Sequence, residues 1–205
     1  MPFDIVVIGT STGGLKALQI LLSGLPADFP VPIVIVQHRA KGSESGLREF
    51  LQQTSNLPLI EPEDKEPLRP GRAYLAPRDY HLLIENGSCA LSTDPPIEHA
   101  RPSVDVLFES APDTYGDRTI GVILTGANHD GARGLNSIKA RGGLTLVEDP
   151  ASANSPAMPA AAIAGTNVDA VLPLEKIASH LTELTRSKTN HFTFAATVPE
   201  GHAEN

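Results

Sequence analysis

The chain has 205 residues, 40% hydrophobic and 20% charged, which is close to the average for soluble globular domains and excludes a fibrous repeat or wholesale disorder. This length is enough for one well-buried core and short for two, so we predict a single domain over residues 1–186. The formal net charge of -8 provides no basic surface to neutralise phosphates, and nucleic acid is therefore not an expected partner.

The N-terminal residues carry no signal-peptide pattern, and no apolar run reaches the roughly 18 residues that a membrane helix needs. We therefore expect a cytoplasmic protein without membrane insertion. Cys89 is the only cysteine, which excludes an internal disulfide and a cysteine-rich metal site. Its place in an alternating stretch predicts a core side chain rather than a reactive thiol.

Buried strands and amphipathic helices alternate along most of the chain. Apolar, β-branched runs predict strands at residues 3–8, 31–36, 119–124, 144–147 and 168–172. Apolar residues at three- and four-residue spacing, with capping signals, predict helices at 14–23, 43–53, from 103, at 131–140, from 155 and at 174–185. This order is typical of an α/β fold, a doubly wound and mainly parallel sheet with helices on both faces.

Some details of the helices also follow from the sequence. Leu15 and Phe50 fall on the faces that the spacing predicts to be buried, and Ser43 is the predicted N-cap of the second helix. Ser103 is the predicted N-cap of the third helix. Pro112 should end or kink that helix, because proline removes a backbone donor.

The stretch between residues 58 and 94 differs from the rest of the domain. It consists of short alternating pieces broken by prolines, with Asn86-Gly87 between two strand-like runs. Asn-Gly is the strongest short signal for a hairpin, so we predict an antiparallel hairpin insert beside the main sheet. From residue 187 the pattern fades, and residues 187–205 are predicted to be a disordered tail.

Three reactive residues directly follow the carboxyl ends of predicted strands. Ser11 follows the first strand, His38 the second, and Asp130 the strand at 119–124. Parallel sheets of this class bind ligands at that edge. A serine, a histidine and an aspartate there correspond to the nucleophile, the base and the orienting acid of a hydrolytic triad.

The segment GTSTGG at residues 9–14 strengthens the assignment of Ser11 as the nucleophile. It contains the Gly-x-Ser-x-Gly spacing that lets a serine lie on a sharp turn from strand to helix with its hydroxyl exposed. The following helix start points unpaired N–H groups toward an anion that forms beside the serine. The amides of Thr12 and Gly13 are therefore candidate oxyanion donors.

Each of these three residues also has a simpler interpretation. Ser11 could be a turn residue that caps the helix, His38 a solvated loop residue, and Asp130 the cap of the next helix. Asp149 also follows a predicted strand and is a rival acid, and His129 adjoins Asp130.

The other histidines fall outside the expected edge. We expect His81 and His180 to be surface or half-buried side chains, while His99 lies in a proline-bounded loop without an assigned role.

A nucleotide-binding domain is a competing class, because a glycine-rich turn follows the first strand. The match is poor, since Ser11 stands where a dinucleotide fingerprint has its second glycine and no acidic residue ends the second strand. The chain has no Gly-Lys-Ser/Thr sequence, which excludes a P-loop.

Four ordered motifs resemble the protein-glutamate methylesterases of bacterial chemotaxis, the CheB family. They are IGTSTGG at 8–14, VQH at 36–38, RPSVDVLF at 101–108, and GVILTG at 121–126 with Asp130-Gly131. The resemblance runs from about residue 3 to 185. It implies a doubly wound α/β fold with the triad on Ser11, His38 and Asp130, and it supports Asp130 over Asp149.

The resemblance also implies the activity. CheB enzymes hydrolyse methyl esters on glutamate side chains of methyl-accepting chemotaxis receptors, releasing methanol, and deamidate certain receptor glutamines, without a metal or cofactor. The remaining alternative within the resemblance is a catalytically altered relative that only binds receptors.

The chain departs from the family pattern in two respects. Ala127-Asn128-His129 replaces the usual Met-Gly-x, whose methionine amide contributes to the oxyanion hole, so Ala127 is the third candidate oxyanion donor. The family generally also carries an N-terminal receiver domain, whereas the first predicted strand begins here at residue 3. Regulation by a separate partner protein is one alternative to that domain.

Overall fold

The computed structural model describes residues 3–39 and 46–186. A seven-stranded sheet forms its centre, with strand order β3-β4-β2-β1-β7-β8-β9 and every pairing parallel. The first half of the chain supplies β1 (Ile5–Thr10), β2 (Ile33–Gln37), β3 (Leu59–Ile60) and β4 (Ala73–Leu75). The second half supplies β7 (Thr119–Ile123), β8 (Leu144–Glu148) and β9 (Ala170–Leu172). The predicted fold class is confirmed.

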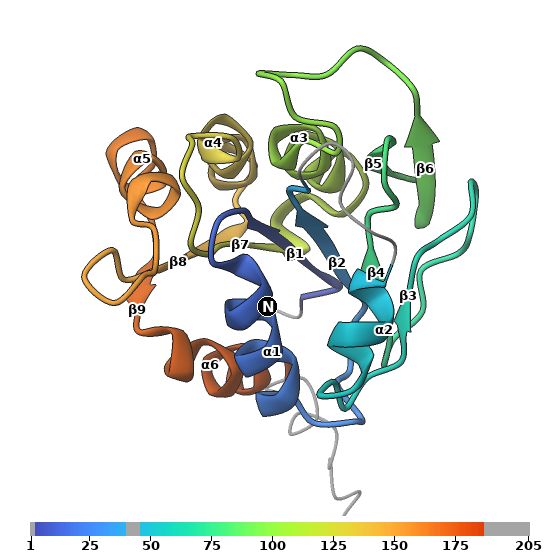
Figure 1. The fold of residues 1–205 in the computed structure, drawn as a ribbon, viewed down its shortest axis with the longest axis horizontal. Helices are drawn as coiled ribbons and strands as arrows, with labels where there is room; N and C mark the ends of the chain where they lie inside the picture. Colours follow the sequence, from blue (N-terminus) through green and yellow to red (C-terminus); the bar gives the residue numbers. More distant parts are fainter. Residues whose placement is uncertain (1–2, 40–45, 187–205) are drawn as a thin grey trace, which may run out of the picture.

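Helices cover both faces of this sheet (Figure 1). One face carries α1 (Gly14–Gly24), α2 (Leu47–Gln52) and α6 (Leu174–Arg186), and the other carries α3 (Val104–Tyr115), α4 (Ala132–Ala140) and α5 (Ala157–Gly165). The strands β1, β2 and β7 are buried on both faces, as their continuous apolar sequences require. The helix after β1 and the helices after β7 and β8 lie on opposite faces, so a ligand crevice is expected where β1 and β7 adjoin.

The predicted hairpin is also present. It joins β5 (His81–Glu85) to β6 (Ser88–Ser92), and both turn residues have positive φ, 49° at Asn86 and 79° at Gly87. The prediction missed β3 and β4, which come from the same region but join the parallel sheet.

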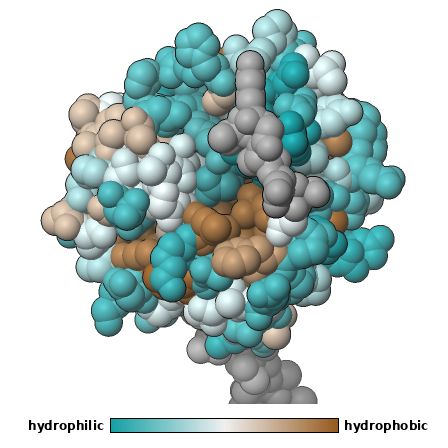
Figure 2. Space-filling view, viewed as in Figure 1, coloured by the Kyte–Doolittle hydropathy of each residue, from teal (hydrophilic) through white to brown (hydrophobic). Residues whose placement is uncertain are grey.

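Other local predictions need correction. Leu15 and Phe50 are each 40% exposed, although the spacing placed them on buried faces. Figure 2 shows apolar residues gathered at the surface over α1. Pro112 does not end α3, which continues to Tyr115. The predicted N-cap Ser43 and the predicted tail 187–205 lie outside the described residues.

None of the helices in the described part of the chain has the length and apolar character needed to cross a bilayer.

Candidate active site

The ends of β1 and β2 bring Ser11 and His38 side by side. Thr10 and Gln37 are register partners at the ends of these strands, and the N–H of His38 donates to the carbonyl of Thr10 at 3.0 Å. Side chains alternate along a strand, so Ser11 continues the β1 row that packs under α3, and His38 continues the corresponding row of β2. The strand geometry therefore directs both residues to the same face of the sheet.

Gly9 allows α3 to approach this pair. A Cβ at Gly9 would lie 2.2 Å from a methyl group of Val104, the first residue of α3, which is far below contact distance. The absence of a side chain at position 9 therefore lets the N-terminus of α3 pack directly against β1, just behind Ser11.

Asp130 lies in the loop after β7 and is almost fully buried. Its Oδ2 lies 2.7 Å from Nε2 of His38 and also accepts the N–H of Val104 at 2.7 Å. Its Oδ1 accepts the hydroxyl of Ser103 and the N–H of Asp105, both at 2.9 Å. The carboxylate thus accepts four hydrogen bonds and caps the N-terminus of α3 from outside that helix.

These contacts correct two local expectations. Ser103 occupies the N-cap position of α3, but its hydroxyl donates to Asp130 and makes no cap hydrogen bond. Asp130 does not cap α4, the helix that follows it. That position is served by Asp105 of α3, whose Oδ1 accepts the N–H groups of Gly131 and Gly134 at 2.9 and 2.8 Å. Asp130, which precedes α4, therefore caps α3, and Asp105, which lies in α3, caps α4.

The hydrogen bonds decide the charge of Asp130. Burial alone would raise its pKa, but the bonds from His38 and from the N–H groups of Asp105 and Val104 outweigh burial and hold the pKa below the ordinary value. Burial raises the pKa of Asp105, and the nearby charge of Asp130 adds to that rise. The site therefore keeps Asp130 ionised beside His38.

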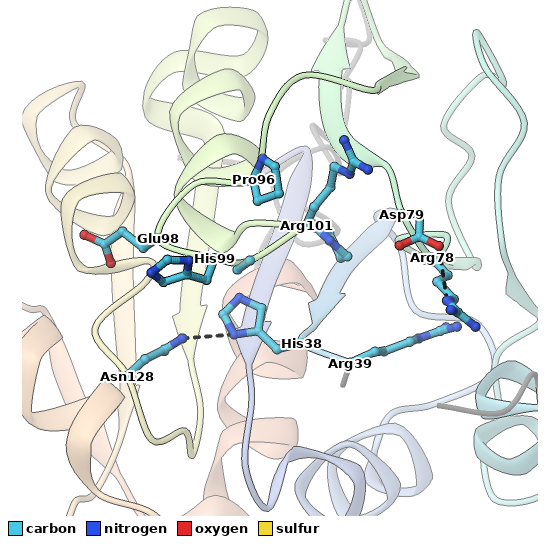
Figure 3. Close-up of a pocket in the computed structure, with 11 residues that line it drawn as sticks. His38, Arg39, Arg78, Asp79, Pro96, Glu98, His99, Arg101 and Asn128 are labelled. Atoms are coloured by element: carbon cyan, nitrogen blue, oxygen red, sulfur yellow. Dashed lines mark hydrogen bonds and ion pairs between the residues drawn. The ribbon is translucent and has the colours of Figure 1, made fainter. Parts of the chain in front are cut away.

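The second ring nitrogen of His38 faces Asn128. Nδ1 lies 3.1 Å from the side-chain nitrogen of Asn128 (Figure 3). Among the residues that the structure describes, the hydroxyl of Ser11 forms no hydrogen bond with the imidazole. Both nitrogens of the ring thus have partners, Asp130 on one side and Asn128 on the other.

Gln37 is a structural residue of the site that the sequence analysis missed. Its side-chain nitrogen donates to the carbonyl of Ser11 at 2.9 Å and to the carbonyl of His38 at 2.8 Å. A single buried amide therefore ties together the two backbone segments that carry these side chains. The sequence carried two signals for it, a polar residue at the end of an otherwise apolar strand and its place in the VQH motif.

The predicted oxyanion donors come from two loops, the turn after β1 and the loop after β7. In the described part of the chain, the N–H groups of Thr12, Gly13 and Ala127 donate to no protein atom, so each is free to donate to an anion. The N–H of Gly14, by contrast, closes the turn on the carbonyl of Ser11 at 2.9 Å.

Gly126 keeps the second of these loops close to Ser11. A Cβ at this position would lie 3.0 Å from Cβ of Ser11 and 1.9 Å from the sulfur of Met158. A side chain at 126 would therefore require Met158 to move and would crowd Ser11.

A pocket of about 240 Å³ opens beside His38 and Asn128 (Figure 3). Three arginines line it, Arg39, Arg78 and Arg101, against two carboxylates, Asp79 and Glu98. The ring of His99 also lines this pocket. The lining favours an anionic or carboxylate-rich ligand over a cationic one.

The arginines are held in place by local partners. Arg39 pairs with Glu61 at 2.6 Å, and Arg78 pairs with Asp79 at 3.2 Å. Arg101 donates to the carbonyls of Thr93 and Asp94 at 2.9 and 3.1 Å, so its charge is not neutralised by these two contacts.

The remaining candidates lie elsewhere or have structural roles. Asp149 accepts the N–H of Ala151 at 2.9 Å within its own turn, and it makes no contact with His38 in the described chain. His129 is exposed and pairs with Glu98 at 2.9 Å. His180 is half-buried on α6, within the predicted range. Cys89 is buried, and burial raises the pKa of its thiol to about 12, which confirms it as an unreactive core residue.

His81 was expected at the surface or half-buried, and this was wrong. It is 1% exposed, and its Nδ1 accepts the N–H of Ser103 at 3.2 Å, while Nε2 lies 3.2 Å from the carbonyl of Pro95. His81 thus supports the segment that leads into α3.

Comparison with known proteins identifies the family. A family model described as CheB methylesterase matches residues 6–181, which is most of the chain. The chain belongs to the CheB methylesterase family. The resemblance on the four sequence motifs is thereby confirmed, and family membership favours the hydrolase over the nucleotide-binding alternative.

Individual CheB relatives agree with this assignment. The crystal structure of the Thermotoga maritima CheB methylesterase catalytic domain superposes with a TM-score of 0.84 at 40% identity, covering 90% of this chain and 100% of that one. A Leptospira interrogans relative is 48% identical over 179 residues, 87% of this chain and 93% of that protein.

A longer relative comes from Anaeromyxobacter dehalogenans. This protein-glutamate methylesterase/protein-glutamine glutaminase 2 is 48% identical over 183 residues, which cover 89% of this chain but 54% of that protein. The chain therefore matches nearly the full length of one relative and about half of another.

Proposed function

We propose that this protein is a cytoplasmic serine esterase that demethylates glutamate methyl esters on chemotaxis receptors, releasing methanol. A second activity, deamidation of receptor glutamines, belongs to the same proposal. The single observation that carries it is the buried hydrogen bond between His38 and an ionised Asp130, directly beside the turn that presents Ser11. Support also comes from relatives named protein-glutamate methylesterase/protein-glutamine glutaminase.

The geometry suggests how each group would act. Ionised Asp130 accepts the proton of Nε2, so the neutral ring offers its lone pair at Nδ1. Nδ1 would take the proton of the Ser11 hydroxyl as its oxygen attacks the ester carbonyl. The same proton then passes to the departing methoxide, which leaves as methanol. The product of this half-reaction is a glutamyl ester on Ser11.

Hydrolysis of that intermediate uses the same base, with water as the nucleophile and Ser11 as the leaving group. Water loses a proton to Nδ1 of His38 and attacks the glutamyl carbonyl, and the proton returns to the oxygen of Ser11 as the ester breaks. The free N–H groups of Thr12, Gly13 and Ala127 are the proposed donors to the oxyanion of both tetrahedral intermediates. For a glutamine substrate the leaving group is ammonia instead of methanol.

The arginine-lined pocket supports an acidic substrate. A receptor segment that carries several glutamates would place its other carboxylates near Arg39, Arg78 and Arg101 while one ester reaches Ser11. The pocket begins at His38, so such a segment would approach the proposed base directly.

Methanol release from methylated receptor membranes tests the proposal. Ser11→Ala should lower the rate by at least about 10³-fold, because the nucleophile is lost while binding contacts remain. Ser152→Ala, at an exposed serine in the turn after β8, is the matched control and should retain the wild-type rate. A fluorophosphonate probe should label the wild type and not Ser11→Ala. Near-wild-type methanol release by Ser11→Ala would refute the assignment.

A further inference from the structure

We propose that Asn128 covers the basic nitrogen of His38, so that Ser11 is activated only after the Asn128 side chain has moved away. This inference rests on the proposed esterase function. It makes Asn128 a positioning residue that acts through His38.

The partners of the ring determine where its protons lie. Oδ2 of Asp130 already accepts the N–H of Val104 and lies 2.7 Å from Nε2, so Nε2 carries the proton that completes this contact. A neutral imidazole then has its lone pair at Nδ1. The side-chain nitrogen of Asn128, which only donates, lies 3.1 Å from that lone pair. The contact is therefore consistent with one tautomer, the one in which Nδ1 can act as a base.

The same contact blocks the reaction in this conformation. The lone pair of Nδ1 accepts one hydrogen bond in the plane of the ring, and Ser11 needs that position to lose its proton. This explains why the described structure holds a His38–Asn128 contact and no hydrogen bond from Ser11 to the imidazole.

The surroundings of Asn128 lower the free-energy cost of moving its side chain away from His38. Its side-chain oxygen is buried and has no hydrogen-bond partner among the described residues, so the carboxamide is held by the single contact to His38. Leaving a buried acceptor unpaired is unfavourable, which lowers the cost of moving the group. Asn128 also lines the arginine-containing pocket, so a substrate that fills the pocket meets the carboxamide first. Substrate entry is the event that would uncover Nδ1.

Two substitutions at this position have opposite expected effects. Asn128→Gly removes the cover, and the loss of one neutral hydrogen bond of about 1 kcal/mol should speed fluorophosphonate labelling of Ser11 about fivefold. Asn128→Asp keeps the shape but can only accept, so it would hold a proton on Nδ1. Labelling of that variant should fall at least about tenfold. Asn128→Ala should behave as the glycine variant does, without loosening the loop backbone.

The control is His129→Ala, in the same loop. His129 is 70% exposed in its side chain and does not line the pocket, so its removal should leave the labelling rate unchanged. Equal labelling of wild type, Asn128→Gly and Asn128→Ala would overturn the proposal.

Nitrogen-15 NMR of His38 provides the readout that a purely structural role would not change. In the wild type Nε2 should be protonated and Nδ1 should accept a hydrogen bond. In Asn128→Gly the Nδ1 signal should move toward that of a free lone pair, and in Asn128→Asp both nitrogens should be protonated. An unchanged Nδ1 signal in Asn128→Gly would also overturn the proposal.

The two proposals fail in different ways. If neither the wild type nor Asn128→Gly reacts with the probe or releases methanol, the proposed esterase function fails, and the gating of Ser11 fails with it. The NMR signals then still decide whether the Asn128 side chain covers Nδ1 of His38. If both react, and at the same rate, the esterase function stands and only the role of Asn128 is refuted.

Discussion

Asp130→Asn preserves the size of the side chain but replaces one acceptor oxygen with an NH₂ group. The native carboxylate accepts two hydrogen bonds at each oxygen. If the amide oxygen stays toward His38 and Val104, the NH₂ group faces the N–H of Asp105, which then has no acceptor. One unpaired buried donor costs about 1–3 kcal/mol, so we expect a loss of about 2 kcal/mol in unfolding free energy. For a domain of this size the melting temperature should fall by about 4–8 °C.

The activity should fall much further than the stability. The amide carries no charge, so the imidazolium formed when His38 takes a proton loses its counterion, and kcat/KM should drop by about 10³–10⁴-fold. Urea denaturation and methanol release are measured on the same preparation. Asp149→Asn, at the rival acid, is the control and should keep wild-type activity, since the Asp149 carboxylate bonds within its own turn and does not contact His38 in the described chain.

The acid side of the stability curve provides a second measurement. The pKa of Asp130 is lowered on folding, so its ionised form contributes stability above the unfolded pKa, and this contribution is lost as pH falls through the folded pKa. The deficit of Asp130→Asn should therefore shrink toward low pH. A variant with unchanged unfolding free energy and activity, or equal loss of activity in Asp149→Asn, would refute the assignment of Asp130.

Three further perturbations test other parts of the site. Gln37→Leu removes the amide that donates to the carbonyls of Ser11 and His38. We expect kcat to fall at least about tenfold while the circular dichroism spectrum is unchanged. Retention of full kcat would contradict a positioning role for Gln37. Gly126→Ala should lower the unfolding free energy by about 1–3 kcal/mol, because the new methyl group overpacks against Met158. The double variant Gly126→Ala with Met158→Ala should be less destabilised than the sum of the two single changes, and simple additivity would mean that this clash is not the cause. Burial raises the pKa of Glu148, whose carboxylate accepts the N–H of Thr125. Relative to Glu148→Gln, the wild type should therefore lose stability as pH rises from the unfolded pKa of Glu148 through its folded pKa. Melting temperatures of the two proteins that change in parallel across that range would contradict the effect.

The main sheet was predictable because its central strands are buried on both faces. Continuous apolar runs mark β1, β2 and β7, and the glycine-rich turn and strand ends then locate Ser11 and His38. By contrast, β3 and β4 have two and three residues, too few to show a period. Their place in the sheet depends on pairing with β2, which local sequence does not encode.

The supporting contacts of the site were not predictable for a related reason. The N-terminus of α4, the helix after Asp130, is capped by Asp105, which lies 25 residues before Asp130. The hydroxyl of Ser103 donates to Asp130 and not to the N-terminus of its own helix. Local capping rules assume a partner within a few residues, so they assign both groups wrongly. Tertiary packing of α3 against α4 decides these contacts.

The exchange of caps between α3 and α4 has a consequence for the nascent chain. Asp130 reaches His38 only when it also closes the N-terminus of α3, and Asp105 closes α4 only in the same docked arrangement. A partly folded chain, in which the two helices have not yet met, has neither cap and no acid behind the histidine. In the proposed mechanism the acid therefore becomes available only together with the native packing of this layer, and a molecule in which α3 and α4 have not docked would lack it.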